Sequence, residues 1–104
     1  MKHSTIISDA ILTAKYEAEK WLKEADKHQA ACEAETDETQ AIVMAAEARW
    51  SVDNTEEAGI ALDKAYNLHD KAMKEYYEAT EDVKYLETVI EHLSKAEWYI
   101  PLEW

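Results

Sequence analysis

Residues 58–93 read AGIALDKAYNLHDKAMKEYYEATEDVKYLETVIEHL and contain the longest regular pattern of the chain. Mostly apolar residues recur in them at alternating steps of four and three, which places these residues on one stripe of an α-helix. The stripe consists of Ala58, Leu62, Ala65, His69, Ala72, Tyr76, Ala79, Val83, Leu86, Ile90 and Leu93. We expect it to face a neighbouring helix, and we expect its larger members to form the seam of an oligomer. These larger members are Leu62, His69, Tyr76, Val83, Leu86, Ile90 and Leu93.

A second stripe with the same spacing lies in the first third of the chain. It consists of Ile7, Ile11, Ala14, Ala18, Trp21, Ala25, His28 and Cys32. The 104 residues include one glycine and one proline, so little interrupts either stripe. The two stripes predict an all-α protein, a bundle of two or three long antiparallel helices with coiled-coil-like seams.

Helix-capping patterns predict where the helices begin and end. Asp37 followed by Gln40 resembles a capping box, and Asn54 followed by Glu57 is similar, with Gly59 weakening the helix nearby. We therefore predict a single acidic helical domain over 1–104, with helices over about 5–34, 38–52 and 55–99 and an apolar, aromatic tail at 100–104. The alternatives are one continuous helix from 38 to 98, or a kink near 80–82. An intact third helix would outreach the other two, which favours a homodimer.

The bulk composition is strongly acidic. The chain has 23 acidic and 11 basic residues and a formal net charge of −12. This charge disfavours direct binding to nucleic acid or to an anionic membrane. The longest uncharged stretch, residues 39–46, is far too short to span a bilayer, and the first residues do not resemble a signal peptide. With Cys32 as the single cysteine, these features predict a cytoplasmic protein.

Motifs for catalysis or cofactor binding are absent from the sequence. It has no Gly-rich phosphate loop, no Gly-x-Ser-x-Gly turn and no His-Glu-x-x-His. His28 and Cys32 have the i, i+4 spacing of metal ligands, but a third and a fourth ligand are not evident. We interpret them as polar layers of the seam and expect no enzyme activity, no cofactor and no metal. If a seam histidine faced its own copy, a dimer would be destabilised as the pH fell through about 6.5.

Acidic residues cluster in two segments of the sequence. The first, residues 37–57, includes Asp37, Glu38, Glu47, Asp53, Glu56 and Glu57, and the second includes Glu75, Glu78, Glu81 and Asp82. The acids that we expect to contact a partner are Glu56, Glu57, Glu75, Glu78, Glu81 and Asp82. Carboxylates one turn apart can imitate the regular charge of a nucleic-acid backbone and occupy the basic groove of a partner protein. The alternative is an ordinary solvated face, with acids near helix starts complementing the helix dipole.

Aromatic residues off the main stripe are the other candidates for partner binding. They are Tyr77, Tyr85, Trp98, Tyr99 and Trp104. Exposed aromatic side chains are frequent anchors of protein interfaces. Alternatively, the tail folds back over the end of the bundle and the two tyrosines contact another helix.

Three classes of function are compatible with these features. The first, which we favour, is a small acidic binding protein that occludes a host protein with a basic groove, as phage or mobile-element inhibitors of host nucleic-acid-handling or defence systems do. The second is a structural or assembly coiled-coil module. The third is an oligomer that captures a small ligand such as a nucleotide, which the scarcity of Lys and Arg disfavours.

Overall fold

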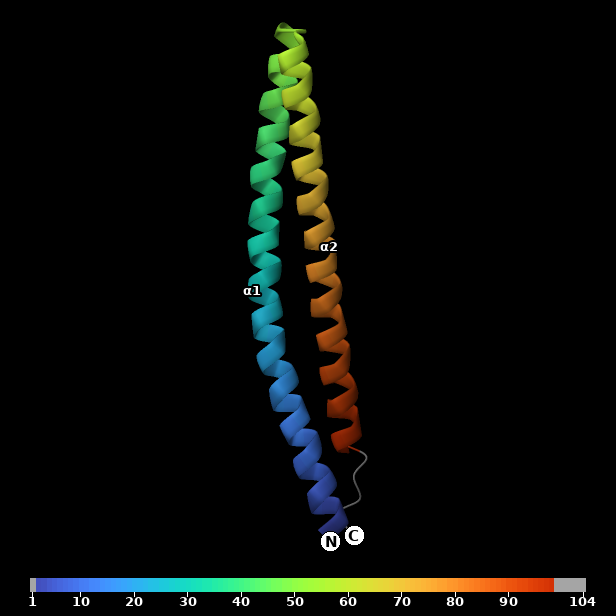
Figure 1. Ribbon diagram of the computed structural model, residues 1–104. Coiled ribbons are helices and arrows are strands. Elements are labelled where there is room, and N and C mark those ends of the chain that lie inside the picture. The colour runs from blue at the N-terminus through green and yellow to red at the C-terminus, as the bar shows by residue number, and fades with distance from the viewer. Residues whose placement is uncertain (1, 99–104) are drawn as a thin grey trace. The chain divides into compact units, whose positions relative to one another are not determined.

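The computed structural model describes residues 2–98, with side chains over residues 6–97. It consists of helix α1, Lys2–Val52, and helix α2, Glu56–Trp98, joined by a three-residue connection at 53–55. The described residues contain no strand. The protein is therefore all-α, and it forms an antiparallel helical hairpin (Figure 1). This confirms the predicted fold class with two helices, whereas dimerisation stays a prediction.

Each helix contributes to two compact units. We call residues 28–80 the loop unit, because they include the connection between the helices, and residues 2–27 with 81–98 the terminal unit. In the loop unit, residues later along α1 contact residues earlier along α2, as expected for antiparallel helices. Gln29 Nε2 bonds to Thr80 Oγ1, and Thr39 Oγ1 to His69 Nδ1. In the terminal unit, Lys15 on α1 pairs with Glu97 near the end of α2.

The connection between the helices is held by hydrogen bonds at both of its ends. The Asp53 amide donates to the Arg49 carbonyl at 2.8 Å and extends the last turn of α1. The Ala58 amide donates to Thr55 Oγ1 at 3.2 Å, so Thr55 is the N-cap of α2. The predicted break near residue 54 is confirmed. However, the predicted cap was wrong by one residue, since Thr55 and not Asn54 accepts the bond.

The predicted turn at residues 35–37 is wrong, because α1 continues through it. Thr36 Oγ1 donates to the Cys32 carbonyl at 2.9 Å and Thr39 Oγ1 to the Thr36 carbonyl at 3.0 Å, both as side-chain bonds along an intact helix. Asp37 lies exposed in mid-helix. The cap-like spacing has no effect here because the residues packed against α2 continue on both sides of it. Helix α2 likewise passes through 80–82 without a break.

The core of the loop unit combines small residues on α2 with larger ones on α1. Ala58, Ala65, Ala72 and Ala79 recur every seven residues on α2, and each is at most 2% exposed. Such a row lets another helix approach closely. The buried side chains facing it from α1 are Cys32, Thr39 and Val43. The approach is also close at Gly59, where an added Cβ would lie 3.2 Å from Trp50 Cζ3.

The terminal unit reverses this arrangement. Here the small residues are on α1, at buried Ala18 and half-buried Ala25. The larger residues are on α2, where Val83 is buried and Leu86, Ile90 and Leu93 are half-buried. In both units, small residues on one helix therefore make room for larger ones on the other. Burial on α2 follows the predicted stripe throughout, but here that stripe faces α1 of the same chain.

The predicted stripe on α1 is wrong at every second position. Ile7, Ala14, Trp21 and His28 are exposed, and the half-buried positions are one residue further along the chain. Those positions are Ser8, Lys15, Leu22 and Gln29. Polar residues are tolerated there because α2 offers partners: Lys15 pairs with Glu97 at 3.5 Å and Gln29 donates to Thr80 at 3.1 Å.

Candidate protein-binding surface

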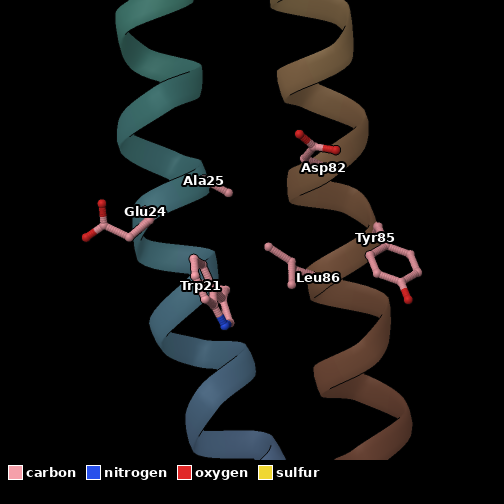
Figure 2. Close-up of a pocket in the computed structure, with 6 residues that line it drawn as sticks. All are labelled: Trp21, Glu24, Ala25, Asp82, Tyr85 and Leu86. Atoms are coloured by element: carbon pink, nitrogen blue, oxygen red, sulfur yellow. The ribbon is translucent and has the colours of Figure 1, made fainter.

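A groove in the terminal unit brings exposed aromatic and acidic side chains together. It has a volume of about 400 Å³ and is lined by Trp21, Glu24 and Ala25 of α1 and by Asp82, Tyr85 and Leu86 of α2. Figure 2 shows Leu86 pointing from α2 toward α1, where Trp21 lies across the gap, and Asp82 one turn before Leu86. Glu24 and Tyr85 point outward at the two edges of the groove (Figure 2).

The two aromatic side chains of this groove are largely open to solvent. Trp21 is 63% exposed and Tyr85 is 69% exposed. Among residues 6–97, Asp82 has no ion-pair partner, whereas Glu24 pairs with Lys27 at 3.7 Å on the surface of α1. An apolar floor under a free carboxylate suits a ligand with an apolar stem and a cationic end.

The loop unit holds a similar but smaller groove. Its volume is about 230 Å³, and its lining includes Tyr76, Tyr77, Glu33 and Asp37. The rings of Tyr76 and Tyr77 are tilted at 55° to each other, with centroids 6.1 Å apart. Tyr76 is half-buried and Tyr77 is exposed. Exposed aromatic rings therefore lie beside carboxylates in both units.

Polar side chains of the seam are paired inside the loop unit. Thr39 Oγ1 lies 2.9 Å from His69 Nδ1, and because the hydroxyl proton of Thr39 points to the Thr36 carbonyl, the Nδ1–H of His69 donates to this oxygen. His69 thus faces Thr39 of its own chain. His28 is exposed and does not form the predicted polar layer of the seam, and its Nε2 lies 3.7 Å from Cys32 Sγ.

The surroundings of Cys32 disfavour the thiolate form of its side chain. Burial is the main cause that raises the pKa of this thiol, and the carboxylates of Glu75 and Glu35 raise it further. The thiolate form that attacks electrophiles and binds metals is therefore disfavoured. In the part of the chain that the structure describes, no three His, Cys, Asp or Glu side chains gather as a metal site would require.

The predicted partner-binding residues are distributed over several places. Glu56, Glu57, Tyr77, Glu78, Glu81, Asp82 and Tyr85 are exposed. Glu75 is half-buried near Cys32, and Glu81 pairs with Lys84 at 3.8 Å. Only Asp82 and Tyr85 share the groove of the terminal unit. The side chain of Trp98, and Tyr99 and Trp104 altogether, lie outside the described residues.

Trp21 and Glu24 are surface residues of the groove that the sequence pattern does not predict. The spacing places Trp21 in the seam, because Trp21 continues the spacing of Ala14 and His28. A usable signal was present in the sequence, since Leu22 offers an equally spaced apolar alternative one position later. A large indole beside a row of alanines fits the edge of a close helix contact better than its centre.

No family model, no curated protein and no solved structure matches this chain. Within the helices that the structure describes, no stretch is long and apolar enough to cross a membrane.

Proposed function

We propose that this chain is a non-enzymatic binding protein of the cytoplasm that acts by occluding a basic surface on another protein. The observation that carries the proposal is the position of exposed aromatic rings beside carboxylates, with Trp21, Tyr85 and Asp82 around one groove. Aromatic side chains supply contact area at interfaces, while unpaired acids provide long-range attraction to a basic partner.

The surplus of acids supports the same function. Among residues 6–97, ion pairs engage only five carboxylates, those of Glu24, Asp53, Glu81, Glu91 and Glu97. Most carboxylates of residues 6–97 therefore have no ion-pair partner, in keeping with the net charge of −12. A protein that normally binds a nucleic-acid backbone is the partner class that this charge fits best, and an inhibitor of a host nucleic-acid-handling or defence protein would use it in this way.

The test compares two variants with the same change of charge. One carries Glu78→Lys, Glu81→Lys and Asp82→Lys, and the control carries Glu38→Lys, Asp70→Lys and Glu87→Lys at exposed positions elsewhere. The wild type and both variants are immobilised, and each is exposed to a bacterial lysate. We expect the wild type and the control to retain a basic nucleic-acid-binding protein that elutes with rising salt or added DNA, and the first variant to lose it.

Two results would contradict the proposal. Equal loss in both variants would show that only bulk charge matters, and retention of the chain by itself alone would favour an assembly module. That second candidate has its own support in the terminal unit, where Ile7, Ala14 and Trp21 form an apolar stripe that α2 leaves exposed. Sedimentation of the purified chain distinguishes the two, because an assembly module associates with itself at micromolar concentration.

A further inference from the structure

We propose that the groove of the terminal unit binds an arginine side chain of a basic partner protein. The inference rests on the proposed function and adds to it the chemical group that is recognised and the place where it binds. The groove combines three features: the exposed indole of Trp21, an apolar floor at Ala25 and Leu86, and the free carboxylate of Asp82. Figure 2 shows these side chains at neighbouring turns of the two helices.

Each feature matches one part of an arginine side chain. The three methylene groups of arginine are apolar and suit the floor at Ala25 and Leu86. Its planar guanidinium stacks on an indole face, where the ring attracts a cation. The same group donates two parallel hydrogen bonds to a carboxylate, which Asp82 can accept. Lysine fits less well, because its ammonium neither stacks as a plane nor forms the two parallel bonds.

The charge around the groove favours a cationic partner over a second copy of this chain. Asp82 and Glu24 line the groove from opposite helices, and exposed Glu78 lies one turn before Asp82 on α2. A two-fold pairing of this groove with itself would bring the Asp82 carboxylates of both copies together, and Asp82 has no ion-pair partner among residues 6–97. A partner arginine instead neutralises them.

The experiment uses the full chain labelled with ¹⁵N and follows its four tryptophan indole signals, assigned by single Trp→Phe variants. The probe is a capped peptide of six arginines, and a capped peptide of six lysines is the comparison. We expect the Trp21 signal to shift to saturation with the arginine peptide, and the lysine peptide to bind several-fold more weakly.

Two pairs of matched variants locate the site. Trp21→Leu is expected to weaken binding of the arginine peptide by about two- to thirty-fold, whereas Tyr16→Leu, which removes an exposed ring of the same unit outside the groove, leaves it unchanged. Asp82→Asn is expected to weaken it about tenfold, whereas Glu87→Gln, with the same loss of charge in the same unit, has a much smaller effect. Trp21 and Asp82 are both exposed, so these changes leave the fold intact.

The outcomes separate this inference from the proposed function. If the arginine peptide shifts other signals but not that of Trp21, or if both peptides bind equally well, the inference is wrong while the proposed function stands. If neither peptide binds anywhere, the proposed function is contradicted as well. If the Trp21 signal shifts with protein concentration alone, a second copy occupies the groove and the inference is overturned.

Discussion

The hydrogen bond between Thr39 and His69 gives the sharpest test of how the loop unit is held together. Thr39 is only 7% exposed, and its hydroxyl donates to the Thr36 carbonyl at 3.0 Å while accepting from His69 Nδ1 at 2.9 Å. Replacing Thr39 by Val keeps the shape of the side chain and removes both bonds. The Nδ1–H of His69 is then left without its partner on α1.

The expected loss of stability follows from these contacts. Two hydrogen bonds at about 1 kcal/mol each are lost, and the added methyl group returns about 0.8 kcal/mol of apolar burial. The loss of a partner for the half-buried His69 adds to the destabilisation, so we expect Thr39→Val to lower the free energy of unfolding by about 1 to 2 kcal/mol. In urea, followed by circular dichroism, the midpoint should fall by about 1 M with an unchanged slope.

A double-mutant cycle and a matched control sharpen this prediction. Combining Thr39→Val with His69→Leu should show a coupling energy of about 1 kcal/mol, because both changes remove the same bond. Thr36→Val is the control, since its hydroxyl bonds only to the Cys32 carbonyl within α1, and it should change stability by less than about 0.5 kcal/mol. Equal effects of the two valine variants, or a coupling energy near zero, would refute the reasoning.

Three further predictions concern single residues. Thr55→Ala removes the N-cap of α2 and should lower the free energy of unfolding by about 1 kcal/mol in urea unfolding, whereas a change at Asn54 should have little effect. Asp37→Ala should leave the urea midpoint unchanged within experimental error, because Asp37 lies exposed in mid-helix. A decrease of about 1 kcal/mol in the free energy of unfolding would instead support a helix cap at Asp37 and the predicted turn. Cys32, whose thiol pKa is raised by burial and by Glu75 and Glu35, should react with iodoacetamide more slowly than free cysteine at pH 8, its rate rising only at higher pH. Glu75→Gln lowers this pKa and should speed the reaction, and no change would argue against the role of that carboxylate.

The buried face of α2 could be predicted from the sequence, because the residues of its stripe are mostly apolar or small. The residues on either side of this stripe are a mixture of polar and apolar types. Ala58, Ala65, Ala72 and Ala79 repeat every seven residues and are all buried. The helical content and the break before Thr55 follow equally from local rules, namely the scarcity of glycine and proline and the capping chemistry.

The pattern of α1 could not be resolved in the same way. Ala18, Ala25 and Cys32 belong both to the predicted stripe of α1 and to its buried face. Apolar residues flank them on both sides of the helix, with Trp21 on one side and Leu22 on the other, so either side could complete the stripe. The spacing of residues shows which of them lie on the same stripe of a helix. It does not show which side of that stripe a partner helix covers.

The sequence by itself thus determined that the chain is helical and which stripe of α2 is buried, because these properties depend on residues close together along the chain. The tertiary structure decided that α1 packs against the stripe of α2 with the side of the helix that carries Leu22, so Trp21 remains at the surface near Asp82. It also decided that α1 continues through Asp37, which therefore caps no helix. The reason is physical: a lysine or glutamine enters a seam only where the facing helix offers a partner. Glu97 and Thr80 become such partners only after the chain has turned back on itself.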